Sequence, residues 1–229
     1  MTNFYDCNIP ANEKILITLE QLGFTGGIIF TETDKFESEQ QKVEDLKSIC
    51  DLELYHGARI KTTNPNHIHK LSQKYLNISD VISVYGGDPT INRIALETPQ
   101  VKILEHPYNN KQNSGMNHIL ARKACDNNTT ISIDYMDILR NKGYYKAKLL
   151  NQIIQLVLIK EKYHFNLMIN SGTKSIYDLR TPRAIKILGN LFNMTTSEVN
   201  KSISNIPSKV IVDIHNKESF IVNGVRKIE

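Results

Sequence analysis

The chain has 229 residues, of which 40% are hydrophobic, and its 28 Lys and Arg side chains stand against 24 Asp and Glu. This composition excludes disordered and fibrous proteins, and the longest apolar stretch, residues 153–159 with Gln155 inside it, is too short to span a bilayer. The amino terminus shows no signal-peptide pattern and the three distant cysteines form no CxxC pair, so we expect a reduced, cytoplasmic protein with buried thiols.

Strand-like and helix-like segments alternate along most of the chain. Short runs rich in Ile, Val, Leu and Tyr predict strands over Phe4–Ile9, Gly27–Thr31, Leu52–Ile60, Val81–Tyr85, Val101–Glu105, Thr130–Tyr135 and Leu167–Asn170. Between them, helical spacing of apolar residues predicts helices over Glu13–Leu22, Gln40–Ile49, Pro65–Leu76, Ile91–Leu96, Gly115–Cys125 and Tyr144–Tyr163.

This alternation predicts parallel strands with right-handed crossovers. Seven such strands fit an α/β, TIM-barrel-like (β/α) barrel, and no GxGxxG follows the first strand to favour a dinucleotide-binding sheet. Beyond residue 175 the pattern is helical: Thr181 caps a helix that begins at Pro182 and runs to Phe192, and further helices begin at residues 196–198 and at Pro207. We expect an extended tail from Lys217, and a single domain over residues 1–229 because no linker is visible.

Few residues suggest catalysis at the strand ends, where barrel enzymes place it. Asp6 lies in the first predicted strand, and Asp134 and Asp137 end or follow the sixth. Such acids bind Mg²⁺ or transfer protons, but they also pair with cations in structural roles, which we favour here. His67 and His69 form an HxH in a helical first turn, where side chains two apart point about 200° apart and cannot share an ion. We therefore predict surface histidines and no metal site.

The segment of residues 170–175, Asn-Ser-Gly-Thr-Lys-Ser, is similar to a phosphate-binding loop. It lacks the upstream glycine of the nucleotide-binding motif, so a plain turn is favoured. Small residues after the seventh strand of a barrel can nevertheless hold one phosphate group, which makes Lys174 a candidate anion-binding residue.

Basic residues concentrate in the second half of the chain. Residues 1–100 hold 9 basic and 14 acidic side chains, whereas residues 101–229 hold 19 and 10, which favours a polyanionic partner. Between Ile138 and Lys160 no acid occurs, and the segment contains Arg140, Lys142, Lys146, Lys148, Tyr144 and Tyr145. A run of this kind is most often only a solvated face.

Two further basic spots lie at predicted helices. Arg180 and Arg183 flank the cap at Thr181, where cations oppose the helix dipole at a cost of roughly 0.3–1 kcal/mol each unless an anion binds. The pair Arg122 and Lys123 forms the other spot. A closed barrel would bring such distant spots near one another, so we expect the basic residues to gather on one face.

Several segments, taken in order, resemble the ribonuclease P protein component 3 family, the archaeal counterparts of the eukaryotic thirty-kilodalton subunit. The segments are residues 4–10 (FYDCNIP), 57–60 (GARI), 115–118 (GMNH), 133–140 (IDYMDILR), 145–150 (YKAKLL), 170–172 (NSG) and 179–183 (LRTPR). The likeness covers most of the chain, and residues 145–150, 170–172 and 179–183 are its most specific parts.

The resemblance implies a barrel related to PHP-type phosphoesterases but without their metal ligands. It also implies a protein subunit of the ribonucleoprotein that removes 5′ leaders from precursor tRNA, in an archaeal cytoplasm. The RNA subunit would be catalytic with Mg²⁺, and this protein would hold no cofactor and would not be a nuclease by itself. A second small protein subunit, in a heterotetramer, is the implied protein partner.

Family positions implicated in RNA support match His118, Arg180 and, more loosely, Arg122 or Lys123. Where the family commonly has Asp after the second arginine, this chain has Ala184, and that acid's structural role is lost or replaced. The residues predicted to bind RNA or a partner protein are His118, Arg122, Lys123, Arg140, Lys146, Lys148, Lys174, Arg180 and Arg183. The alternatives are a free-standing, metal-dependent PHP-like phosphoesterase and a scaffold that binds only protein.

Overall fold

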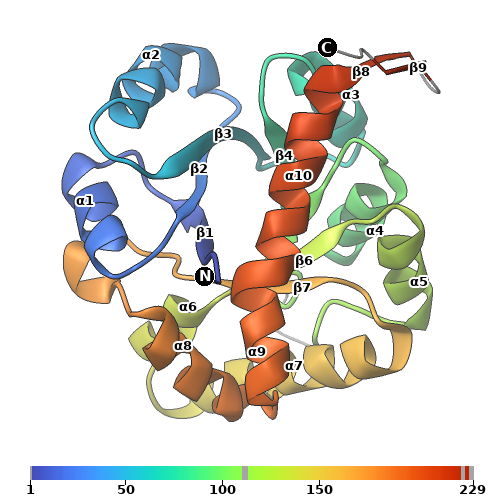
Figure 1. Ribbon diagram of the computed structural model, residues 1–229. Coiled ribbons are helices and arrows are strands. Elements are labelled where there is room, and N and C mark those ends of the chain that lie inside the picture. The colour runs from blue at the N-terminus through green and yellow to red at the C-terminus, as the bar shows by residue number, and fades with distance from the viewer. Residues whose placement is uncertain (1, 110–112, 223–224, 227–229) are drawn as a thin grey trace.

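Seven parallel strands form one sheet in the computed structural model, which describes residues 2–109, 113–222 and 225–226. The strands pair in chain order and are β1 (Tyr5–Ile9), β2 (Gly26–Glu32), β3 (Glu53–Ile60), β4 (Val81–Tyr85), β5 (Ile103–Glu105), β6 (Thr130–Asp134) and β7 (Leu167–Asn170). Seven helices cover the outside: α1 (Glu13–Gln21), α2 (Phe36–Lys47), α3 (Asn66–Tyr75), α4 (Pro89–Glu97), α5 (His118–Asp126), α6 (Tyr135–Arg140) and α7 (Gly143–Tyr163). The sheet curls into a nearly closed barrel (Figure 1), which confirms the predicted TIM-barrel-like fold.

Side chains bridge the first and last strands where the barrel closes. The backbone N–H of Cys7 donates to Asn170 Oδ1 at 3.0 Å, and the backbone N–H of Ser171 donates to Asp6 Oδ1 at 3.1 Å. Both acceptors are buried: Asn170 ends β7, whereas Asp6 is the second residue of β1. Buried polar side chains therefore hold the first and last strands together.

The carboxyl-terminal segment crosses the opposite end of the barrel. It comprises α8 (Pro182–Gly189), the 3₁₀ turn η2 (Asn190–Phe192), α9 (Thr196–Asn200), the π-helical turn η3 (Lys201–Asn205), α10 (Ile206–Ser219) and a hairpin of β8 (Phe220–Val222) and β9 (Val225–Arg226). Val210, Ile211 and Ile214 of α10 pack on Tyr5 and Val81, which begin their strands. Helix α10 thus covers the amino-terminal end of the barrel (Figure 1).

Several element boundaries differ from the predicted ones for local reasons. Helix α2 begins at Phe36 rather than Gln40, because the buried Phe36 ring stacks on His56 with ring centroids 4.1 Å apart and anchors the first turn. Helix α5 begins at His118 rather than Gly115, since Gly115 has a φ of 71° and the Asn117 side chain caps the helix.

Other differences concern whole segments. Helix α6 was not predicted, because Tyr135 begins this helix instead of ending a strand. The expected extended tail from Lys217 is wrong at its start, since α10 continues to Ser219. Of the thiols, Cys7 is buried as expected, but Cys125 is exposed and its Sγ donates to the carbonyl oxygen of Tyr163. No helix within the described ranges is both long and apolar enough to cross a membrane.

Candidate nucleic-acid interface

A polar cavity of about 380 Å³ opens at the carboxyl ends of the strands, which we call the mouth. Its lining residues come from the ends of six strands and the loops after them, and they include Asn8, Glu32, Arg59, Lys61, Tyr85, Glu105, His106, Asp134, Asp137, Arg140 and Lys174. Barrel proteins place their functional groups at this end. The mouth is therefore the first place to look for a site.

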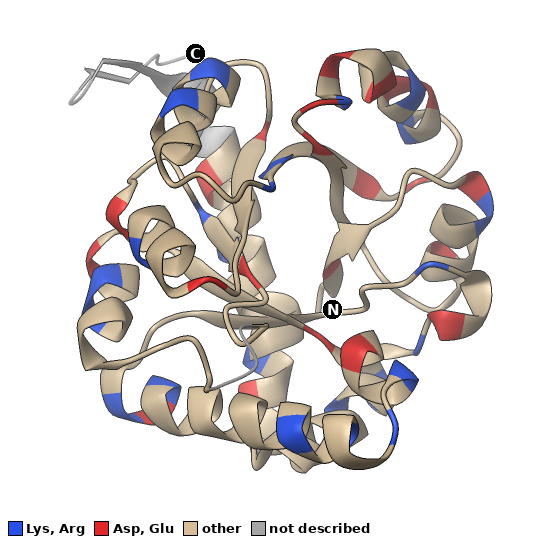
Figure 2. Ribbon diagram, turned by 180° about the vertical axis from the view of Figure 1, so that it is seen from behind, with Lys and Arg blue, Asp and Glu red and all other residues tan. Residues whose placement is uncertain are grey.

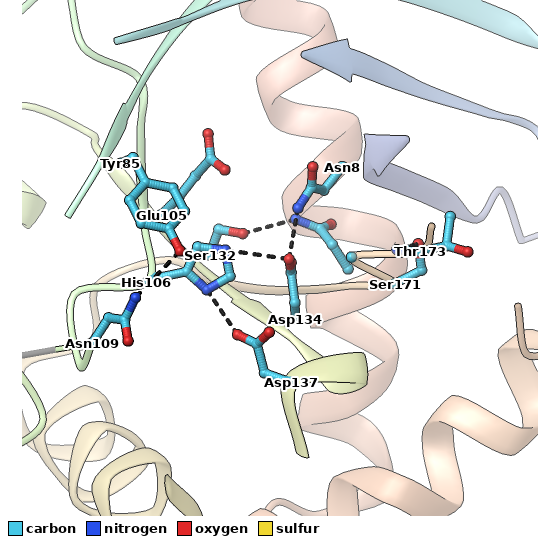
Figure 3. A network of polar contacts seen from close by, with 12 residues as sticks. Asn8, Tyr85, Glu105, His106, Asn109, Ser132, Asp134, Asp137, Ser171 and Thr173 are labelled. Carbon is cyan, nitrogen blue, oxygen red and sulfur yellow. Dashed lines mark hydrogen bonds and ion pairs between the residues drawn. The ribbon is translucent and has the colours of Figure 1, made fainter. Parts of the chain in front are cut away.

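His106 is the centre of the mouth (Figure 3). It follows β5 directly and has a φ of 48°, a left-handed conformation that is uncommon for a residue other than glycine. Its Nε2 lies 3.3 Å from Asp134 Oδ2, and its Nδ1 lies 3.0 Å from both Asp137 Oδ2 and the hydroxyl of Tyr108. The buried imidazole thus bridges two carboxylates.

Burial and contacts with neighbouring groups shift the pKa values of His106 and Asp137. Burial disfavours a charged imidazole, yet contacts with Tyr108, Asp134 and Asp137 hold the pKa of His106 well above its usual value. Burial likewise disfavours ionised Asp137, but its hydrogen bond and attraction to His106 hold the pKa of this carboxyl below the usual range. The raised pKa of His106 and the lowered pKa of Asp137 both favour a charged pair at this contact.

A second ion pair connects the other strand ends. Arg59 Nε donates to Glu105 Oε1 at 2.9 Å, and a terminal nitrogen lies 2.8 Å from Oε2. Arg59 also donates to Asn8 Oδ1 at 2.6 Å, and Asn8 Nδ2 donates to Asp134 Oδ2 at 2.6 Å. Burial alone would raise the pKa of Glu105, but Arg59 lowers it. An ion pair and hydrogen bonds therefore connect strands β1, β3, β5 and β6.

The acids singled out from the sequence belong to this network. Asp6 accepts hydrogen bonds from the backbone N–H groups of Asn8 and Ser171, and its complete burial raises its pKa to about 7. Asp134 and Asp137 contact His106. Among the residues that the structure describes, no three His, Cys, Asp or Glu side chains form a group that could hold a metal ion. All three acids thus contact groups of their own chain, and the structural role favoured from the sequence stays a prediction.

Two weaker motifs have structural explanations. His67 and His69 are both exposed and contact different residues: His67 contacts Thr62 and Asn64, whereas His69 contacts Thr98. This confirms the expected surface histidines.

The loop of residues 170–175 is a plain turn. The backbone N–H of Thr173 donates to Ser171 Oγ, and that of Ser175 donates to Thr173 Oγ1. The N–H of Lys174 donates to Asp178 Oδ2. These donors are already occupied, so they do not form a free phosphate cradle.

Two of the predicted basic residues meet at the mouth. Arg140, at the end of α6, donates to Asp178 Oδ2 at 2.5 Å and to the carbonyl oxygen of Gly172 at 3.0 Å. Lys174 is exposed on the loop after β7 and lines the same cavity. Arg140 is thus held by the protein itself, whereas the ammonium group of Lys174 faces solvent.

Arg180 and Arg183, the two arginines near α8, differ in their contacts. Arg180 Nη1 donates to the carbonyl oxygens of Tyr177 and Leu179 at 2.8 and 2.7 Å, which hold the guanidinium in place but do not neutralise its charge. That both arginines bind an anion stays a prediction. Thr181 caps the backbone N–H of Ala184, as predicted. Arg183 is exposed and makes no ion pair with a described residue. Arg183 therefore keeps its charge available for a partner.

The remaining predicted residues lie on α5 and α7. His118, Arg122 and Lys123 are exposed on α5, and His118 and Arg122 share a face because they are four residues apart. Figure 2 shows Lys and Arg along α5 and α7, while Asp and Glu are frequent on α2. The structure thus joins Arg140 to Lys174 at the mouth but leaves the α5 residues as a separate group on the outer ring.

The beginning of α7 carries cations that form no ion pair with any described residue. Its first turn contains no acid and its amino terminus has no side-chain cap. Lys146 and Lys148 form no ion pair with a described residue, and Tyr144 and Tyr145 are 74% and 73% exposed. Lys160, farther along α7, differs because it pairs with Glu198 at 2.6 Å. Exposed tyrosines beside unpaired lysines are suited to unstacked bases and phosphates.

Sequence reasoning missed His106, Arg59 and Tyr108. A signal existed for two of them, since Arg59 stands one residue before the end of β3 and His106 directly follows β5. Polar residues at strand ends mark the open end of a barrel. Their pairing across the barrel was not readable, because it depends on the register of all seven strands.

Comparison with known proteins agrees with the sequence resemblance. The chain matches the family described as RNase P subunit p30 over residues 3–219. Ribonuclease P protein component 3 of Methanothermobacter thermautotrophicus is 30% identical over 234 residues, covering 99% of this chain and 96% of that protein. The protein of the same name from Methanococcoides burtonii is 30% identical over 235 residues, with coverages of 99% and 95%.

Solved structures share the fold. A chain of archaeal ribonuclease P with mature tRNA matches with a TM-score of 0.86 and 23% identity, covering 98% of both chains. Adenine deaminase from Arthrobacter aurescens matches with a TM-score of 0.53 and 8% identity, covering 90% of this chain and 76% of that one. These likenesses support the barrel alone, whereas the sequence matches support the family. The chain belongs to the RNase P subunit p30 family.

Proposed function

We propose that this chain is a protein subunit of a ribonuclease P ribonucleoprotein, which it enters by binding and supporting the RNA. The observation that carries the proposal is the family match over residues 3–219. Its relatives in Methanothermobacter and Methanococcoides are named as ribonuclease P components. The unpaired cations on α7 and α8 supply the attraction that an RNA partner requires.

In this proposal the RNA subunit, with Mg²⁺, removes the 5′ leader of precursor tRNA, and the protein stabilises the folded RNA. The charged groups at the mouth favour this division, because the acids there are engaged by His106 and Arg59. A second small protein subunit completes the assembly, which we propose to be a heterotetramer of the two proteins.

Reconstitution tests the proposal. The purified chain and its partner protein are added to ribonuclease P RNA, and cleavage of precursor tRNA is measured with each component omitted in turn. We expect cleavage at low Mg²⁺ to need this chain, and we expect no cleavage by the chain alone. Unchanged cleavage without the chain would overturn the proposal. Cleavage by the chain alone that a chelator abolishes would favour the phosphoesterase instead.

A further inference from the structure

A second cavity, of about 280 Å³, lies beside the mouth, between β4, the residues that follow β5, and the first turns of α7. Three tyrosines line it, Tyr85, Tyr108 and Tyr145, together with Asp137, Lys148 and Gln152. Tyr85 and Asp137 also line the mouth, so the two cavities are adjacent. An aromatic cavity with polar groups and a cation at its side differs from the charge-balanced mouth.

Gln152 supplies a hydrogen-bond donor without an acceptor. The residue is only 7% exposed, and its Nε2 is buried with no hydrogen-bond partner among the described residues. Neighbouring positions of α7, Ile153 and Leu156, are fully buried and apolar, so the amide is an exception on this helix face. A buried donor is unfavourable unless an acceptor meets it. Because Gln152 lines the cavity, rotation of its side-chain amide toward the cavity would let a ligand provide that acceptor.

Asp137 supplies an acceptor in the same cavity. Its contacts with His106 and Tyr108 both fall on Oδ2, and the side chain is 36% exposed. Figure 3 shows this carboxylate beside His106, whose positive charge keeps it ionised. A ligand that presents N–H donors to Asp137 and an acceptor to Gln152 would therefore match the polar groups of this cavity.

The aromatic walls are partly fixed before any ligand arrives. The Tyr85 hydroxyl accepts a hydrogen bond from Asn109 Nδ2 at 3.2 Å, and its ring lies 4.9 Å from that of His106. The hydroxyl of Tyr108 contacts His106 and Asp137. Tyr145, in contrast, is 73% exposed and touches only the edge of the Tyr144 ring among the aromatic contacts of the described residues. Its ring is free to close on a planar ligand.

We propose that this cavity receives one unstacked base of an RNA strand, with guanine favoured over the other bases. The inference rests on the proposed function and adds the kind of nucleotide recognised. Guanine offers N1–H and N2–H donors to a carboxylate and O6 or N7 as acceptors for an amide, while tyrosine rings stack on its faces. Lys148, at the side of the cavity, attracts the adjoining phosphate.

A protein ligand fits less well. An Arg or Lys side chain would satisfy Asp137, but it offers no acceptor to Gln152 and is repelled by Lys148. An acidic side chain would satisfy Gln152 and Lys148 but is repelled by Asp137. A base carries donors and acceptors on one rigid plane, and this combination matches all three groups.

The test measures binding of end-labelled pentaribonucleotides to the full chain by fluorescence anisotropy. Four uridines surround a central G, A, C or U. We expect the central-G strand to bind about tenfold more tightly than the all-uridine strand, a discrimination typical of a paired base contact. Tyr145→Ala and Gln152→Leu should each lower affinity for the central-G strand by about tenfold. The matched control is Tyr177→Ala, which removes a ring that is 83% exposed, lies outside α7 and does not line the cavity.

Several outcomes would overturn the inference. Equal binding of all four strands, with Tyr145→Ala and Tyr177→Ala behaving alike, would show that the cavity does not bind a base. Weaker binding of the partner protein by Tyr145→Ala and Gln152→Leu, with strand binding unchanged, would assign the cavity to protein. Melting temperatures of all variants identify any that fails to fold, and Gln152→Leu retains the side-chain volume. The reconstitution assay separates this inference from the proposed function. If the binding test fails but the wild-type chain still supports precursor-tRNA cleavage, the base site is disproved and the proposed function stands.

Discussion

The mouth of the barrel and the beginning of α7 both carry many charged side chains, but their environments are opposite. At the mouth Arg59 pairs with Glu105, and His106 with Asp134 and Asp137. On α7, Lys146 and Lys148 have no ion pair with a described residue. Paired buried charges hold a shape and offer little net attraction, whereas unpaired exposed charges attract a polyanion. Charge count alone therefore does not locate an RNA-binding surface.

This contrast explains why the basic residues predicted from the sequence separate into two kinds. Arg140 and Arg180 donate to acceptors of their own chain around η1 (Ile176–Asp178). Lys148, which is half-buried, and Arg183, which is exposed, make no ion pair with a described residue. The four predictions that follow test each side of this division.

The largest effect is expected at the Arg59–Glu105 pair. Arg59→Met leaves Glu105, whose side chain is 2% exposed, without its cation, and unfolding free energy should fall by about 3 kcal/mol. Lys61→Met is the control, because it breaks a pair with side chains 58% and 40% exposed and should cost less than about 1 kcal/mol. Denaturant titration measures both. Equal losses would contradict the view that the mouth is locked by buried charge.

The next effect depends on pH and concerns Asp6. Burial raises its pKa to about 7, so the folded state holds the proton more tightly than the unfolded chain does. The stability that this proton gives is complete below about pH 4 and is lost as pH rises through 7. Asp6→Asn keeps an acceptor for the N–H groups of Asn8 and Ser171 without a titrating charge.

The unfolding free energy of Asp6→Asn minus that of the wild type should therefore rise by about 2–3 kcal/mol from pH 5 to pH 8. Parallel denaturant titrations at the two pH values measure the change, and common contributions from other groups cancel in the difference. A stability difference that stays constant with pH would show that Asp6 is ionised in the folded protein throughout this range.

How far the sequence predicts this molecule depends on the range of the interactions. All seven strands were predicted, because their Ile- and Val-rich runs, such as those in β4 and β6, are signals contained in a few residues. The helix that begins at Pro182 was predicted for the same reason, since Thr181 and Pro182 are neighbours. Local signals thus sufficed for the barrel.

The site was predicted less well, because its contacts join distant residues. The bond from Arg59 to Asn8 spans 51 positions, and the two carboxylates that His106 contacts belong to β6 and α6. The carbonyl oxygens that satisfy Arg180 are near in sequence, but only the η1 turn aims them at the guanidinium. The sequence therefore predicts which types of residue lie at these positions, but not which partners they contact.

A smaller effect is expected on the unpaired side of the comparison. Lys146→Glu should weaken binding to ribonuclease P RNA about tenfold and reduce the log–log salt slope by about 0.7–0.9. Lys162→Glu is matched in charge and in helix, but it lies in the last turn of the 21-residue α7. Filter binding over a threefold salt range measures both variants. The same loss with Lys162→Glu would mean that overall charge, and not the beginning of α7, attracts the RNA.

The smallest effects separate the two arginines that flank Thr181. Arg180→Ala removes hydrogen bonds to two carbonyl oxygens and should cost about 1 kcal/mol of unfolding free energy. Arg183→Ala removes an exposed charge without a described ion pair, so stability should change by less than about 0.5 kcal/mol. Cleavage of precursor tRNA by the reconstituted enzyme should nevertheless fall with Arg183→Ala. Thermal unfolding and the cleavage assay on the same preparations distinguish the two roles, and a loss of stability with Arg183→Ala equal to that with Arg180→Ala would place both arginines in the structural group.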